Sequence, residues 1–89
     1  MYESAKKRND IEITAGILKM AAHGARKSHI VYEVNLNFKI LDKYLELLRK
    51  NDLINGPREN NEFTTTQKGL GYLDHFEGFQ KYVQTMTLI

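Results

Sequence analysis

The most regular pattern of apolar and polar positions lies in residues 35–54, NLNFKILDKYLELLRKNDLI. Projected at 100° per residue, the charged side chains fall on one arc and the apolar side chains fill the opposite half, which is typical of an amphipathic surface helix. Asn37 is a suitable N-cap, because its side chain can accept a hydrogen bond from a free N–H group of the first turn. Lys39 and Lys43 then lie near the helix start, where a bound phosphate would offset their repulsion by the helix dipole. For either lysine alone, a solvated charged face is the simpler interpretation.

Residues 10–22 are predicted to form the first helix, with Asp10 or Asn9 as the N-cap. Gly24 follows the last periodic residue and favours a helix end there. Gly16 lies inside the helix, where glycine is unfavourable, so it indicates close packing. The inward-facing positions recur at helical spacing: Ile11, Ala15, Leu18 and Ala22.

Residues 26–34, RKSHIVYEV, are predicted to form a short helix capped by Ser28, with Ile30, Val31 and Val34 facing inward. The β-branched residues make a strand the alternative. A helix is favoured because only two or three residues separate this segment from the next helix, as in a helix-turn-helix unit.

The chain then changes period at Leu53 and Ile54, which form a short apolar pair before the turn-rich segment 55–60, NGPREN. Glu62, Phe63 and Thr64 are predicted to return as a strand. The resulting hairpin carries Arg58 near its tip, either as part of a plain exposed loop or as a wing that touches DNA.

The last helix is predicted to begin at Thr66, with Thr65 or Thr66 as its cap and with Leu70 and Leu73 facing the core. Its later apolar residues follow a heptad spacing that lasts two heptads. So small a core cannot bury all of them, so a second copy of the chain is expected to cover this seam. The alternative is that the helix bends back over the first helix. The predicted dimerisation residues are Tyr72, Phe76, Phe79, Val83 and Met86.

Composition limits the class of protein. The chain has 89 residues, a net charge of +2 and no cysteine, and 42% of its residues are hydrophobic. It is expected to be one small cytoplasmic domain without disulfides, because no apolar run reaches the roughly 18 residues of a membrane span. The mildly basic charge permits an anionic partner without requiring one. The segment 1–9 contains Lys6, Lys7 and Arg8, and it is expected to be a flexible basic terminus or an arm along a phosphate backbone.

Catalytic chemistry is not indicated. His23, His29 and His75 are scattered, and no two have helical spacing or a neighbouring carboxylate cluster. No glycine-rich phosphate loop or nucleophile elbow is present. We therefore expect neither an enzyme nor a metal or cofactor site, and the core is too small for an evident small-molecule pocket.

The segments GARKSHIVYEVNLNFKILDKYLELLRKNDLI and FTTTQKGLGYL resemble the small archaeal winged helix-turn-helix regulators. That family includes chromatin-associated DNA-binding proteins with a C-terminal dimerisation helix. The resemblance covers roughly residues 11–73, and the ordered set of motifs carries it rather than any single one. It implies a mainly α fold with a small β-hairpin, in which a three-helix core is followed by a wing and a C-terminal helix.

The resemblance further implies that residues 10–65 form a DNA-binding domain and residues 66–89 a dimerisation helix. The expected partner is double-stranded DNA, bound by a homodimer associated with the nucleoid, in a regulatory or architectural role. The low net charge favours site-specific regulation over coating of bulk DNA. The short last helix, which contains Gly78, differs from the long antiparallel coiled coil of the family. The alternative is a winged helix used for protein–protein contact, which Asp42 and Glu46 favour because carboxylates in a groove repel DNA. The DNA-binding positions implied by the resemblance are Arg26, Lys27, Ser28, Asn37, Phe38, Lys39, Lys43 and Arg58.

Overall fold

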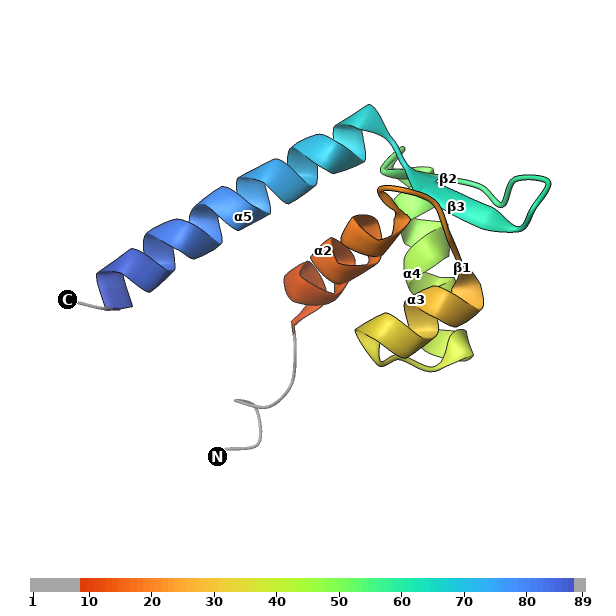
Figure 1. The fold of residues 1–89 in the computed structure, drawn as a ribbon, viewed down its shortest axis with the longest axis horizontal. Coiled ribbons are helices and arrows are strands. Elements are labelled where there is room, and N and C mark those ends of the chain that lie inside the picture. The colour runs from red at the N-terminus through yellow and green to blue at the C-terminus, as the bar shows by residue number, and fades with distance from the viewer. Residues whose placement is uncertain (1–8, 88–89) are drawn as a thin grey trace.

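The computed structural model describes residues 9–87, and for residues 83–87 it describes the backbone alone. The order of elements is the predicted one, with one added strand (Figure 1). The predicted basic residues Lys6, Lys7 and Arg8 lie outside the described residues. The elements are α2 (Asp10–Ala21), β1 (Ala25–Arg26), α3 (Lys27–Val34), α4 (Phe38–Lys50), β2 (Ile54–Asn55), β3 (Glu62–Thr65) and α5 (Gln67–Thr87).

The core forms where α2, α3 and α4 meet the strands and the first turns of α5. Phe63 of β3 and Leu73 of α5 join the helical side chains there, so both the hairpin and the last helix are anchored by burial. The largest fully buried side chains come from α2, α3, α4 and β2: Ile17, Leu18, Ile30, Leu41 and Ile54.

The sheet has three short antiparallel strands in the order β1-β3-β2. The predicted hairpin is β2 and β3, in which Ile54 pairs with Thr65. The third strand, β1, was not predicted: Ala25 pairs with Phe63 and Arg26 with Glu62. Arg26 is therefore in a strand rather than in the helix predicted for residues 26–34.

Two asparagines cap helices as expected. Asn9 accepts from the Glu12 N–H at 2.8 Å in a reciprocal capping box. Asn37 accepts from the Ile40 N–H at 2.8 Å and starts α4. The prediction that Ser28 caps α3 is wrong, because Arg26 occupies the N-cap position and forms no side-chain cap there.

The end of α4 and the start of α5 are bonded to each other. The Thr66 hydroxyl donates to the Asp52 carbonyl at 2.6 Å, and the Lys68 ammonium donates to the Asn51 carbonyl at 3.0 Å. Thr66 also caps α5 by accepting from the Gly69 N–H at 3.0 Å. A Cβ atom on Gly69 would lie 2.3 Å from the Leu53 carbonyl oxygen, so only glycine fits this contact. We call this set of contacts the α4–α5 joint.

Some predicted core positions are exposed. Ile11 was expected to face inward but is 57% exposed, because it lies in the first turn of α2, at the edge of the core. Leu70 is 41% exposed, since Gly69 and Leu73 take the core side of that turn. On α4 the core covers a narrower arc than the apolar half predicted, which leaves exposed Phe38, Ile40 and Leu47.

The first half of α5 packs beside α2, and the helix then continues past the start of α2 (Figure 1). The Tyr72 hydroxyl donates to the Ile11 carbonyl at 3.3 Å, and burial raises the pKa of Tyr72 while its hydrogen bond with Thr14 opposes that shift. Phe79 is 65% exposed. The side chains of Val83 and Met86, predicted in the same seam, lie outside the described residues. No helix among the described residues is long and apolar enough to cross a membrane.

Candidate nucleic-acid interface

The start of α3 and the hairpin enclose a concavity of about 330 Å³. The pairing of β1 with β3 brings Arg26 opposite Glu62, and this register places the first turn of α3 beside the hairpin loop. Within the described part of the chain, the side chain of Arg26 forms no hydrogen bond or ion pair. We call this concavity the α3–wing pocket; its lining residues are Arg26, Lys27, Ser28, Pro57, Asn61 and Phe63.

The electrostatics of the α3–wing pocket favour an anion. The first N–H groups of α3 have no side-chain cap and carry the positive end of the helix dipole. Arg26 and Lys27 add two formal positive charges beside them. Lys27 also pairs with Asp42 of α4 at 2.7 Å, and both side chains are about half exposed, so the pair contributes less than about 1 kcal/mol to stability. This ion pair connects the pocket to α4.

The exposed face of α4 carries a row of charged side chains at a spacing of four, three and four residues. The row lies opposite Leu41, Leu45 and Leu48, which are buried, so it faces away from the core. No hydrogen bond or ion pair involves these side chains anywhere in residues 9–82. We call this row the α4 ridge; it consists of Lys39, Lys43, Glu46 and Lys50.

Asn37 and Phe38, the two predicted DNA contacts at the start of α4, differ in how available their side chains are to a ligand. The side-chain oxygen of Asn37 is occupied by the Ile40 N–H, so it is not available to read an adenine edge with both amide groups. Phe38, at the first helical position, is 51% exposed and has room to meet a ligand.

Lys43 also borders a second, shallow groove of about 280 Å³ with Asp10, Thr14, Tyr44 and Leu47. There the Tyr44 hydroxyl donates to the Asp10 carboxylate at 2.6 Å. Lys43 is therefore on the flank of α4 away from the ion pair of Lys27 with Asp42.

The predicted residues thus form two neighbouring groups rather than one cluster. Arg26, Lys27 and Ser28 lie together in the α3–wing pocket, and Lys39 and Lys43 lie along the α4 ridge. Arg58 is exposed at the hairpin tip, next to Pro57 of the pocket. Its main chain closes the loop: its N–H donates to the Glu62 carbonyl at 2.9 Å and its carbonyl accepts from Asn61 at 2.8 Å.

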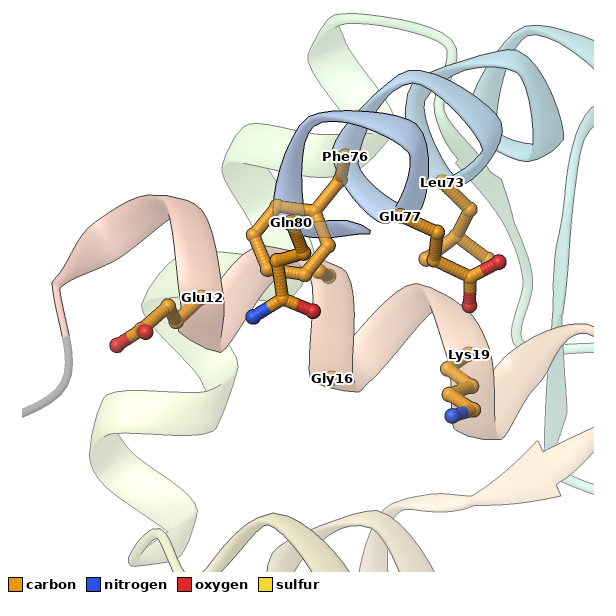
Figure 2. A pocket seen from close by; sticks show the side chains of 8 residues that line it. Glu12, Gly16, Lys19, Leu73, Phe76, Glu77 and Gln80 are labelled. Carbon is orange, nitrogen blue, oxygen red and sulfur yellow. The ribbon is translucent and has the colours of Figure 1, made fainter. Parts of the chain in front are cut away.

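A separate groove of about 300 Å³ lies between α2 and α5 (Figure 2). Its floor is formed by Ala15, Gly16, Leu73 and Phe76, and its rim carries both signs of charge. The mixed rim, made of Glu12, Lys19, Glu77 and Gln80, does not favour a polyanion. Within the described part of the chain, no group of three or more His, Cys, Asp or Glu side chains could hold a metal ion.

Sequence reasoning missed two residues of these surfaces. Pro57 and Asn61 line the α3–wing pocket. The sequence of the hairpin loop alone does not show that β3, the strand after the loop, pairs with β1. Lys50 and Glu46 belong to the α4 ridge by the same helical spacing as Lys39 and Lys43, and that spacing was readable from the sequence.

Comparison with known proteins gives two findings. The winged helix-turn-helix family matches residues 7–84. The crystal structure of Sso10a-2, a DNA-binding protein from Sulfolobus solfataricus, is similar with a TM-score of 0.78 and 27% sequence identity, covering 90% of this chain and 86% of that one. No curated protein matches the sequence at a significant level.

Proposed function

Since the chain belongs to the winged helix-turn-helix family, we propose that it binds duplex DNA as a homodimer and acts as a transcriptional regulator. In this proposal the α4 ridge enters the major groove, and the α3–wing pocket and Arg58 hold the flanking phosphates. The similarity to a DNA-binding protein from an archaeon supports DNA binding here.

The α3–wing pocket is the observation that carries the proposal. It combines uncapped helix N–H groups, Arg26 and Lys27 in one concave place beside α4. Phosphates are bound at such helix starts because the dipole and the free donors act together. Contacts of this kind fix the register of the protein on DNA, while base contacts from α4 would give sequence preference.

The experiment is titration of a labelled duplex with the full chain at about 50 and 200 mM salt. If Arg26, Lys27, Arg58 and two lysines of the α4 ridge meet phosphates in each subunit, the logarithm of the affinity falls with the logarithm of salt at a slope of about −4 to −5 per subunit. Arg26→Ala should weaken binding and flatten the slope by about one. Lys19→Ala is the matched control, because Lys19 lies in the α2–α5 groove. A slope near zero for the unmodified protein would rule out the phosphate contacts.

The homodimer is proposed from the exposed seam of α5. Phe79 and Tyr82 are about two thirds exposed on a helix that runs past the start of α2. Tyr72 and Phe76 pack partly against the chain's own core, so Phe79 is the predicted seam residue that stays exposed among residues 9–82. An antiparallel pair of helices crossing at Phe79 would cover it.

Phe79→Asp should convert the dimer to a monomer in sedimentation equilibrium, because a buried carboxylate without a partner is unfavourable. Leu70→Asp is the matched control, since Leu70 is exposed on another side of the same helix. A wild-type protein that sediments as a monomer, or an unchanged mass for Phe79→Asp, would contradict this interface.

A second function deserves a test, because Ile11, Ile40 and Leu47 are between 40% and 57% exposed. Exposed apolar side chains favour contact with another protein where they form one contiguous patch. If the full chain shifts no duplex at low salt yet retains a protein partner, the fold serves protein–protein contact instead.

A further inference from the structure

One acidic residue interrupts the lysines of the α4 ridge. Glu46 follows Lys43 by three residues and precedes Lys50 by four, so the three side chains project from the same side of the helix. This side is opposite the buried face of α4. A helix that enters a groove with the ridge leading would bring Glu46 to the base edges together with the lysines.

The two carboxylates of α4 differ in their partners. Asp42 pairs with Lys27 at 2.7 Å, which neutralises it and holds it toward α3. Glu46 is exposed and, in residues 9–82, forms no ion pair or hydrogen bond, although lysines lie at both helical spacings where pairs can form. Its oxygens are therefore free to accept hydrogen bonds from a ligand.

Only part of a DNA duplex can satisfy such an acceptor. Phosphates offer no hydrogen-bond donor and repel a carboxylate. In the major groove the donors are the exocyclic amino groups of cytosine and adenine, and acidic side chains typically accept from the cytosine N4 amino group.

We propose that Glu46 reads sequence by accepting a hydrogen bond from the N4 amino group of a cytosine, so that the protein prefers a C·G pair at that position. This inference rests on the proposed function, because it needs α4 in the major groove. Lys43 lies about 4.5 Å back along the helix axis, close to the roughly 3.4 Å rise of one base pair, so it reaches the neighbouring pair. Lysine there favours the O6 and N7 acceptors of guanine.

The test uses the full chain and a pool of duplexes randomised over about two DNA turns. Bound duplexes are sequenced for the wild type, Glu46→Ala, Glu46→Gln and Asp42→Ala. Affinities are then measured for the most enriched duplex and for a second duplex in which the enriched C·G pair is replaced by T·A. Asp42→Ala is the matched control, because it removes the same charge from the same helix but not from the ridge.

The wild type should prefer the C·G duplex by roughly tenfold, within the range of a good base contact. Glu46→Ala should bind both duplexes about equally, and Asp42→Ala should retain the preference. Glu46→Gln should lose cytosine preference in favour of adenine, since a glutamine amide matches the adenine edge.

Two results would overturn the inference while the proposed function stands. One is a wild type that binds the pool but enriches no cytosine. The other is a Glu46→Ala variant that binds every duplex more tightly by the same factor and keeps the preference, because Glu46 would then act only by repulsion. Failure of the wild type to bind the pool at about 50 mM salt would instead reject the proposed function itself.

Discussion

At the scale of single residues, the start of α4 depends on Asn37. Its side-chain oxygen accepts the Ile40 N–H, and its main-chain carbonyl accepts the Leu41 N–H at 3.0 Å. Both bonds satisfy groups at the end of the helix that faces the proposed DNA. Asn37 thus stabilises the helix directly, and it would affect DNA binding only by fixing where α4 begins.

Asn37→Ala should lower the free energy of unfolding by about 1 kcal/mol, because a first-turn N–H group loses its acceptor. Asn37→Asp should keep the stability, since a carboxylate caps as well and is favoured by the helix dipole. The same Asp variant should bind DNA more weakly, because it adds a negative charge at the interface. Urea unfolding and duplex titration on both variants measure the two effects; equal stability losses for Ala and Asp would contradict the capping role.

At the scale of elements, local patterns located the helices and the hairpin. Helical spacing, the caps Asn9, Asn37 and Thr66, and the turn-rich segment 55–60 are all properties of neighbouring residues. The strand β1 was missed because two residues become a strand only through pairing with Phe63 and Glu62, far along the chain. Likewise, the apolar half of α4 could be read from the sequence, but the width of the arc that the core covers could not.

The same limit applies to the interface. The sequence supplied its charged residues, and the family resemblance placed them on α3, α4 and the wing. Neither of them showed that Lys27 forms an ion pair with Asp42, or that the side-chain oxygen of Asn37 accepts a main-chain N–H. Such pairings depend on the distance between elements, which no local pattern contains.

The α4–α5 joint gives a matched pair of glycine substitutions. Gly69→Ala should destabilise the protein strongly, because the new Cβ would meet the Leu53 carbonyl oxygen at 2.3 Å and the Thr65 side chain at 2.5 Å. Gly71→Ala, one half turn along the same helix, should stabilise it by up to about 1 kcal/mol, because a Cβ there meets nothing within 4 Å. Thermal unfolding of both variants compares them. Similar melting temperatures would show that the joint tolerates a side chain.

At the scale of the whole molecule, the length of α5 sets a distance. From Gln67 to Phe79 the helix rises about 18 Å at 1.5 Å per residue. In an antiparallel dimer crossing at Phe79, the starts of the two α5 helices would therefore be about 36 Å apart along the pair. The end of α4 is bonded to the start of α5, so the ends of the two α4 helices would have a similar separation. It is close to the roughly 34 Å of one DNA turn that is expected between two half-sites on one face of the duplex.

Such a dimer should therefore bind two copies of its preferred half-site most tightly when their centres are one turn apart. Inserting about 5 base pairs turns the second half-site to the far side of the duplex and should weaken binding, and inserting about 10 should restore much of it. Titrations with the three duplexes measure this. The Phe79→Asp variant is the control, and its affinity should not depend on the spacing. A wild-type affinity that does not depend on the spacing would contradict the two-fold arrangement.

The α4–α5 joint also decides how the chain can be divided. A cut after Thr65 would remove Thr66 and Lys68, which bond the carbonyls after α4, together with Leu73 from the core. The winged helix is therefore not a detachable module, and a foreign dimerisation helix grafted in place of α5 would have to retain residues 66–73. An exchange that begins beyond Leu73 keeps these bonds, so it should replace the proposed dimer contact while leaving the α3–wing pocket and the α4 ridge intact.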